Sequence, residues 1–455
     1  MIVPVAAQRS WPRHAACAQA AAPTARFGST AISSSRATSR GRPGGVGMAL
    51  AFTACLVAAA PAAGLTVEDC VRLALARSPA VRAALADARG AAALVRSARA
   101  AYWPSLAAKG DYGVSKGFDR AVTNGGQTDA LVSLGATLLD GGLRDARLAA
   151  AQASLRSATA KEVQQRADVV FAVRAAYFQA VAAEAALAIQ DDDIRMLRAY
   201  VALLERQEAR GIVPHNDVLR AELAVQAAET ARRASAADSQ TARDALAILA
   251  GVDVRAGTLE EPDVRFVPPS GEAVEGAPVI VDARATAETA HREVDAIRSE
   301  RRSQLRLTAD GGALGVRPGP TFRDNGGGQF LLGLTLPLFD GGVIAARIGA
   351  AEATALGTDS RLEEARQTLQ IALARVEADA RHAEADVAAG RRTAPIASEQ
   401  FQLMRARYLG GGNVRLLEVL DALSVYADAR LSVPRSLLAY RTAVAAEGQA
   451  LGEVP

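Results

Sequence analysis

The chain has 455 residues, of which half are hydrophobic and only 4% are aromatic, and alanine dominates. Small side chains of this kind favour closely packed helices over one thick globular core. The net charge of +3 arises in residues 1–67, which contain six arginines and no acidic residue, so the remainder is close to −3. Proteins that bind phosphate backbones need a basic surface, and its absence here excludes nucleic acid as a partner.

Residues 1–63 are predicted to be a signal peptide with an N-terminal extension. A basic, acid-free segment precedes an apolar run at 46–59 and the small-residue site Ala60-Pro61-Ala62, the order that secretory signals show. A mitochondrial transit peptide would also fit residues 1–42 but explains the apolar run less well. Lipid attachment at Cys55 is a further alternative. No later run of 18 apolar residues exists, so we expect no transmembrane helix in the mature chain.

A first structural unit is expected over residues 64–256. It begins with a helix at about 67–99, which Thr66 and Asp69 can cap. Alternating apolar and polar residues then predict two strands, joined by a polar loop into a β-hairpin at 102–139. A long helical hairpin at 143–250 completes the unit.

The first arm of that helical hairpin is exceptionally long. Residues 143–210 contain no glycine and no proline, and a helix of this length would extend about 100 Å. Ile194, Leu197, Val201 and Leu204 follow one another at steps of three and four, which is coiled-coil spacing. Gly211 and Pro214 interrupt the pattern, so the second arm has to return antiparallel to the first.

The chain then repeats this plan. Residues 138–153 and 338–353 are identical at nine of sixteen positions, and a match at a fixed long period indicates a duplicated unit. We expect a linker at 257–278 and a second unit at 279–455, with a β-hairpin at 303–339 and a helical hairpin at 343–450. Each unit joins its strands to its long helix through Asp-Gly-Gly. These predicted strand–helix joints are Asp140, Gly141, Gly142, Asp340, Gly341 and Gly342.

Each predicted strand carries an apolar face that nothing else in the chain can cover. Strands of about ten residues with alternating faces are typical of membrane β-barrels, in which lipid covers the apolar side. No open strand edge survives in lipid, so several copies of the chain would have to close the barrel together. The pattern favours an outer-membrane channel with a helical conduit in the periplasm. The alternative is a non-channel periplasmic coiled-coil adaptor or structural protein, with two small soluble hairpins on a helical rod.

The chain resembles the TolC-type outer-membrane efflux family over residues 65–452. The resemblance rests on 65–81, on Tyr102–Leu106, on both Asp-Gly-Gly joints and on the segments 211–222 and 413–422. It implies an α+β membrane protein of the bacterial outer membrane. It also implies a homotrimer, whose 12-stranded barrel takes four strands from each chain and continues into a coiled-coil barrel of long antiparallel helices. It implies an efflux or type I secretion duct that works with a periplasmic adaptor and an inner-membrane transporter of RND, MFS or ABC type.

The same resemblance implies where such a duct is gated. Members of the family close their periplasmic end with charged networks and rings of acidic residues. The positions that match here are Asp217, Glu418, Asp421, Arg415 and Tyr408. Three glycines at 410–412 add one residue to the second turn and bring Arg415 one position closer to the acid, which leaves its assignment open. The adaptor would dock at the two turns, at Gly211, Val213, Gly412 and Val414.

Nothing in the sequence points to catalysis. The four histidines are scattered without metal-ligand spacing, and no nucleotide-binding P-loop sequence is present. We therefore expect neither an enzyme nor a bound metal or cofactor, and the energy for transport would have to come from a partner.

Overall fold

A computed structural model describes residues 65–118, 126–251, 257–316 and 325–454. The predicted signal peptide lies outside these residues. The first half of the chain contains α1 (Val67–Arg77), α2 (Pro79–Ala100), β1 (Ser105–Val114), β2 (Gly126–Leu139), α4 (Leu143–Glu208) and α5 (His215–Ala250). The second half contains α6 (Gly271–Gly276), α7 (Pro278–Ser299), β3 (Gln304–Val316), β4 (Gly326–Thr335), α8 (Val343–Leu409) and α9 (Leu416–Leu451).

The first helix differs from its prediction, because the chain breaks at Ser78 and forms α1 and α2 in place of one helix. A residue that precedes proline is disfavoured in the helical conformation, and Ser78 adopts an extended ψ of 123° before Pro79. Its side chain then accepts a hydrogen bond from the backbone N–H of Val81, so the same residue that ends α1 caps α2.

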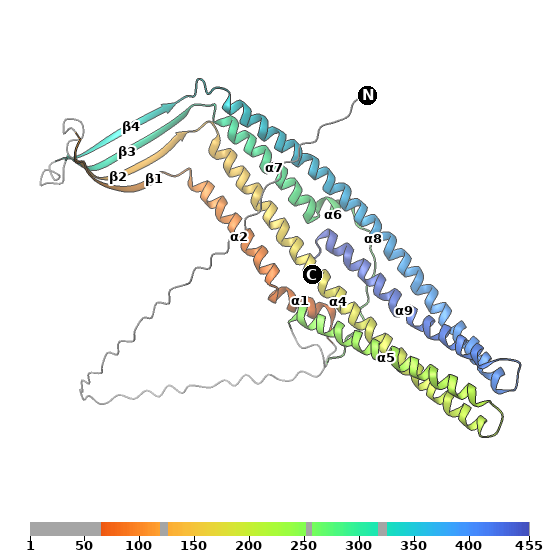
Figure 1. The fold of residues 1–455 in the computed structure, drawn as a ribbon. Helices are drawn as coiled ribbons and strands as arrows, with labels where there is room; N and C mark the ends of the chain where they lie inside the picture. The colour runs from red at the N-terminus through yellow and green to blue at the C-terminus, as the bar shows by residue number, and fades with distance from the viewer. Residues whose placement is uncertain (1–64, 119–125, 252–256, 317–324, 455) are drawn as a thin grey trace, which may run out of the picture. The chain divides into compact units, whose positions relative to one another are not determined.

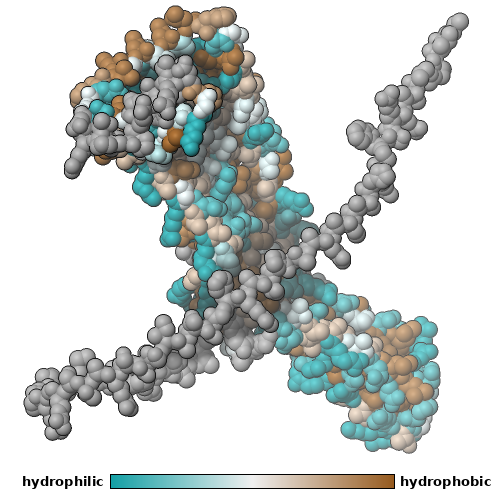
Figure 2. All heavy atoms as spheres, turned by 60° about the vertical axis from the view of Figure 1, so that its left-hand side comes forward, coloured by the Kyte–Doolittle hydropathy of each residue, from teal (hydrophilic) through white to brown (hydrophobic). Residues whose placement is uncertain are grey.

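The four strands form one antiparallel sheet in the order β1-β2-β3-β4. The register places Leu106, Leu134, Ala309 and Phe330 in one row across the sheet. Phe330 is 85% exposed and Leu106 is 71% exposed. Figure 2 shows hydrophobic side chains gathered over this part of the molecule. The sheet therefore keeps a continuous apolar face that no other described element covers.

The two long helices, α4 and α8, span 66 and 67 residues, and each turns back into a helix of 36 residues. Figure 1 shows the sheet at one end of these helices and the two helical turns at the other. Near the turns, side chains from both helical hairpins form one buried cluster, which includes Leu204, Val218 and Val419. The cluster holds the two turns beside each other.

One helix among the described residues, α4, is long and apolar enough to cross a membrane by length and composition. This is weak support for a span, because a helix packed inside a protein passes the same test, and α4 packs against α2, α5, α7 and α9. The expectation of no transmembrane helix therefore stays a prediction, because closely spaced alanines keep the mean hydropathy of α4 high across occasional charged residues.

The segment after residue 257, predicted as a linker, packs against the helices and is hydrogen-bonded to them. Leu65 pairs with Leu259 in a parallel bridge. The buried Tyr177 hydroxyl lies 2.7 Å from the carbonyl oxygen of Leu65 and 2.8 Å from that of Glu260. Ser270 caps the six-residue helix α6, which was not predicted, through a hydrogen bond from the backbone N–H of Ala273. The segment thus forms part of the packed structure around α1, α4 and α9.

Candidate functional site: the helical turns and the strand–helix joints

The first helical turn reverses the chain between α4 and α5. Gly211 adopts a φ of +70°, a conformation that costs other residues energy. The N–H of Ile212 donates to the carbonyl of Gln207 at 2.9 Å. Val213 is half-buried and packs against the cluster that joins the hairpins. Asp217 then lies in the first turn of α5, where a carboxylate favours the positive end of the helix dipole.

The second turn is tighter around its glycines. Gly411 has a φ of +75°, and a side chain at Gly412 would approach the carbonyl oxygen of Arg407 to 2.9 Å. The N–H of Gly412 donates to that same carbonyl at 2.8 Å. Val414 packs on the buried cluster as Val213 does. Arg415 is the residue before α9, which begins at Leu416.

The structure brings Tyr408 and Asp217 together across the two hairpins. The Tyr408 hydroxyl donates to Asp217 Oδ2 at 2.7 Å. Burial, and then the hydrogen bond to Asp217, raise the pKa of Tyr408 above its ordinary value. The tyrosine therefore stays a neutral hydrogen-bond donor over the physiological pH range. The hydrogen bond joins α8 to α5 close to both turns.

Arg415 and Glu418 form a separate pair. Arg415 Nε lies 3.1 Å from Glu418 Oε1, and the Arg415 side chain is largely exposed while that of Glu418 is partly exposed. Asp421 follows one turn later on the same face of α9, with its side chain exposed to solvent. Among the described residues, no hydrogen bond or ion pair links this face with the Tyr408–Asp217 pair. The five predicted gate residues thus lie at one end of the helices in two separate groups.

Two further features near the turns were not identified from the sequence. The Tyr200 hydroxyl is buried and has no hydrogen-bond partner among the described residues. Further along α4, Arg430 of α9 binds Asp192 at 2.8 Å and Asp193 at 2.9 Å. Burial raises the pKa of Asp193 even though Arg430 opposes the shift. The run Asp191–Asp193 was visible in the sequence, but its partner on α9 depends on how the helices pack.

Both strand–helix joints are built in the same way. Asp140 Oδ1 accepts the N–H of Gly142 at 3.2 Å, and its Oδ2 accepts the N–H of Arg144 at 2.9 Å. In the second joint Asp340 accepts the N–H groups of Gly342 at 3.0 Å and Ile344 at 2.6 Å. All four glycines have φ values between +67° and +95°. The glycines turn the strand into the helix, and the aspartate satisfies helix N–H groups that would otherwise lack acceptors.

The surroundings of the two joints differ. Arg302, which follows α7, donates to the carbonyl of Gly141 at 2.8 Å. A Cβ atom at Gly141 would collide with Arg302 at 2.5 Å, whereas a Cβ atom at Gly341 or Gly342 would meet no other atom within 4 Å. The first joint is therefore enclosed by its own chain, and the second is open.

Within the described residues, no group of three or more histidine, cysteine, aspartate or glutamate side chains could hold a metal ion. The chemistry at the turns and joints is that of hydrogen bonds, ion pairs and backbone geometry.

The outer membrane efflux protein family model matches residues 70–252 and 270–453. Protein CyaE of Bordetella pertussis is 28% identical over 378 residues, covering 80% of this chain and 79% of CyaE.

Solved structures share the fold. A membrane protein from Pseudomonas aeruginosa aligns with a TM-score of 0.77 at 23% identity, over 85% of this chain and 93% of that one. The outer membrane protein VceC from Vibrio cholerae aligns with a TM-score of 0.75 at 22% sequence identity, over 85% of this chain and 96% of VceC. The outer membrane channel MtrE from Neisseria gonorrhoeae, in its open state, aligns with a TM-score of 0.72 at 22% sequence identity, over 85% of this chain and 88% of MtrE. At these identities the likeness establishes the architecture of long helices and a small β-domain.

Proposed function

Because the chain belongs to the outer membrane efflux protein family, we propose that three copies of it assemble into one export duct. The protein is an outer-membrane channel for efflux or secretion, with helices that extend into the periplasm. Family membership sets aside the non-channel periplasmic adaptor. The trimer, the closed barrel, the gate and the partners are the proposal, and the sheet is the observation that carries it.

The two faces of the sheet differ in polarity. Leu305 and Leu334, which pair directly, lie on the apolar face with Leu106 and Phe330. The opposite face carries Asp310 and Gln329, whose side chains are hydrogen-bonded at 3.0 Å. A membrane barrel needs such an alternation, with apolar side chains toward lipid and polar ones toward the lumen.

The outer strands β1 and β4 have unpaired edges, and the duplication predicts how they meet. Leu106 pairs with Leu134 in the first hairpin, and Leu305 pairs with Leu334 in the second. We treat these two leucine pairs as equivalent positions of the two hairpins. A residue of β3 then corresponds to the residue of β1 that is 199 positions earlier (305 minus 106). A residue of β4 corresponds to the residue of β2 that is 200 positions earlier (334 minus 134). The observed pairing of β2 with β3 within one chain is then the template that predicts how β4 of one chain would pair with β1 of the next chain.

The template gives a specific register. Val132 pairs with Gly311, which places Leu332 of one chain opposite Tyr112 of the next. Ala130 pairs with Ala313, which places Phe330 opposite Val114. Both pairs place apolar or aromatic residues on the lipid side, so the register is consistent with the faces of the sheet.

Three copies are the smallest number that leaves a duct. Two copies would give eight strands, a barrel that side chains fill. Three would give twelve strands, within the range of outer-membrane barrels. The open joint at Gly341 and Gly342 would then face the turn after α2 of the next chain, as Arg302 faces Gly141 within one chain.

The long helices would form the periplasmic part of the duct and close it at their turns. α4 alone would reach about 100 Å from the joint. The Tyr408–Asp217 hydrogen bond would hold the two hairpins in the closed arrangement. Threefold symmetry would repeat Glu418 and Asp421 around the entrance. Transport is passive, and the gate opens when the hairpins move apart.

Opening requires partners at the turns. An adaptor would dock at the ends of the hairpins, where Gly211 and Gly412 are exposed and Val213 and Val414 are half-buried. An inner-membrane transporter of RND, MFS or ABC type would supply the energy. The match to the efflux family and the similarity to CyaE support an efflux or secretion role.

A pair of arginine substitutions on β4 tests the barrel. Leu334 lies on the proposed lipid face and Leu331 on the opposite face, and they are 67% and 62% exposed. Leu334→Arg should block assembly, because a charge in the lipid-facing band of a barrel costs about 2–4 kcal/mol at the midplane. Leu331→Arg should still give heat-modifiable trimers in the outer membrane. Normal trimers from Leu334→Arg would contradict the assignment of the faces.

A further inference from the structure

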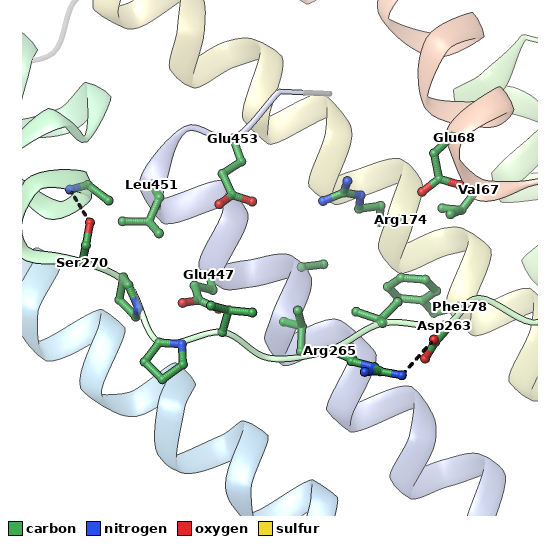
Figure 3. A pocket seen from close by; sticks show the side chains of 17 residues that line it. Val67, Glu68, Arg174, Phe178, Asp263, Arg265, Ser270, Glu447, Leu451 and Glu453 are labelled. Carbon is green, nitrogen blue, oxygen red and sulfur yellow. Dashed lines mark hydrogen bonds and ion pairs between the residues drawn. The ribbon is translucent and has the colours of Figure 1, made fainter.

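A cavity of about 570 Å³ lies beside the segment after residue 257. Its walls come from α1, α4, α9 and the segment itself, all within one chain. Val67, Phe178 and Leu451 supply apolar surface, and Glu68, Arg174, Glu447 and Glu453 bring charges (Figure 3). The cavity is far along the helices from the turns, and nothing in the proposed transport mechanism uses it.

Glu447 is the unusual member of this lining. The residue is 6% exposed, and its Oε1 atom has no hydrogen-bond partner among the described residues. A buried carboxylate without a partner loses its hydration and gains nothing in return. Burial, and then the negative charges of Glu453 and Glu377, raise the pKa of Glu447. The side chain therefore lacks the positive group that a buried carboxylate requires.

The neighbouring charges are also unpaired. In the part of the chain that the structure describes, no hydrogen bond or ion pair engages the side chains of Glu68, Arg174 or Glu453. Elsewhere on the helices arginines are commonly paired, as Arg441 is with Glu261 at 2.9 Å and Arg430 is with Asp193. Glu68 and Glu453 are exposed to solvent, so the buried and unpartnered Glu447 is the member of this group that points to a ligand.

The local backbone sets Glu453 over the cavity. Gly452 ends α9 with a φ of +76°, and the N–H of Glu453 then donates to the carbonyl of Gly448 at 2.8 Å. This glycine-terminated turn is a common way to end a helix. It directs the chain back over the last turn of α9, so that Glu453 stands near Glu447.

The charges that line the cavity indicate whether its ligand is a cation or an anion. The lining contains the four acidic residues Glu68, Asp263, Glu447 and Glu453, and the two arginines Arg174 and Arg265. Asp263 and Arg265 pair with each other at 3.6 Å on the exposed rim. Three carboxylates then face one guanidinium group, and a negatively charged cavity with apolar walls suits a cation that carries an apolar body.

We propose that this cavity binds a small organic amine, whose ammonium group pairs with Glu447 and whose apolar part packs against Leu451 and Val267, apolar lining residues that keep accessible surface. The ligand forms two or three charge-assisted hydrogen bonds with the carboxylates. The site is separate from the duct, and it requires neither the trimer nor the gate.

The test uses three probes of the same shape and different charge. 2-Phenylethylammonium is the cation, 2-phenylethanol is the neutral analogue, and phenylacetate is the anion. Binding is measured by isothermal titration calorimetry on the purified full-length protein in lipid nanodiscs, with empty nanodiscs subtracted. Only the cation should bind saturably to the wild-type protein. Equal binding of the alcohol would overturn the role of charge, and absence of saturable binding of the cation would overturn the site.

Matched variants locate the binding. Glu447→Gln keeps the shape of the side chain and should weaken binding of the cation by at least about tenfold, as expected for loss of a charged hydrogen-bond partner. Glu399→Gln, an exposed carboxylate on α8, should leave the affinity unchanged. Equal affinity in both variants would contradict the assignment.

A third variant tests the same site in case Glu447→Gln fails to fold. Val267→Phe narrows the cavity from its exposed wall without altering a charge, and it should also weaken binding. Single-channel conductance recorded on the same preparations separates the two proposals. Normal conductance without amine binding would overturn the amine site alone.

Discussion

Tyr408 on α8 and Asp217 on α5 share a hydrogen bond of 2.7 Å across 191 residues of chain. It is the direct polar contact between the two helical hairpins that lies nearest to both turns in the described structure. Because the tyrosine pKa is raised, the contact persists at any physiological pH. If the turns close the duct as proposed, the stability of the closed state should depend on these two side chains.

Tyr408→Phe should favour the open channel. Removing the hydroxyl leaves Asp217 without its partner, and a hydrogen bond to a charged group contributes about 1.5–3 kcal/mol. Open probability in planar bilayers should rise by roughly tenfold or more. Tyr426→Phe is the control, because that ring stacks on Phe401 and its hydroxyl has no recorded partner among the described residues. Equal conductance behaviour of the two variants would remove the pair from the gate.

Neutralising Glu418 and Asp421 together should change ion selectivity. In a trimer the two positions would supply six carboxylates at the entrance, and a cleft lined by one sign of charge concentrates counter-ions. The double variant Glu418→Gln with Asp421→Asn should lose sensitivity to multivalent cation block and shift the reversal potential toward anions. Glu272→Gln, on α6 away from the turns, should change neither. Unchanged reversal potentials in the double variant would place these residues outside the pore.

The first joint should contribute stability that depends on pH. Burial acts to raise the pKa of Asp140, but hydrogen bonds from the backbone and side chain of Arg144 outweigh it, and the pKa is lowered overall. A folded-state pKa below the unfolded value stabilises the fold above the unfolded pKa, and that stability is lost as pH falls through the folded value.

Asp140→Ala should therefore destabilise the protein by about 0.5–2 kcal/mol at neutral pH, the usual cost of losing a helix cap, and by less in acid. Asp340→Ala is the matched comparison, because it removes equivalent backbone contacts in a more exposed joint and should cost less. Thermal unfolding at pH 7 and at pH 3 measures both. A larger effect of Asp140→Ala in acid than at neutrality would reverse the predicted sign.

Cysteine pairs test the register between chains. Leu332→Cys with Tyr112→Cys should form an intermolecular disulfide, since the template places these residues directly opposite on one face. Leu332→Cys with Gly113→Cys should not, because a one-residue shift turns the side chain to the other face. Non-reducing electrophoresis would show a covalent trimer for the first pair. The native Cys70 is fully buried and does not compete. Efficient cross-linking of the second pair instead would show that the strands meet in another register.

The sequence predicted the elements whose signal is periodic or uninterrupted. Alternation located the strands, the absence of glycine and proline located α4, and Asp-Gly-Gly located both joints. The break at Ser78 was missed because a long amphipathic pattern continues through it, although Pro79 disfavours a helical conformation at the preceding residue. The helix α6 was missed because six residues carry too little periodicity.

The candidate sites divide in the same way. Residues near the turns could be placed on their helices, since spacing fixes which side chains share a face. How the two hairpins pack on each other could not be derived, so the α9 partner of Asp193 and the burial of the Tyr200 hydroxyl are known only from the structure. The unpaired Glu447 also depends on packing between α9, α4 and a segment that looked like a linker.

The unpaired edges of β1 and β4 have a consequence for how the channel is made. A chain that has folded but not yet assembled exposes a row of free backbone donors and acceptors on each outer strand, beside an uncovered apolar face. Such edges pair readily with any extended chain. If the barrel closes between chains as proposed, closure has to compete with aggregation through these edges, and its yield should depend on how quickly partner chains reach them.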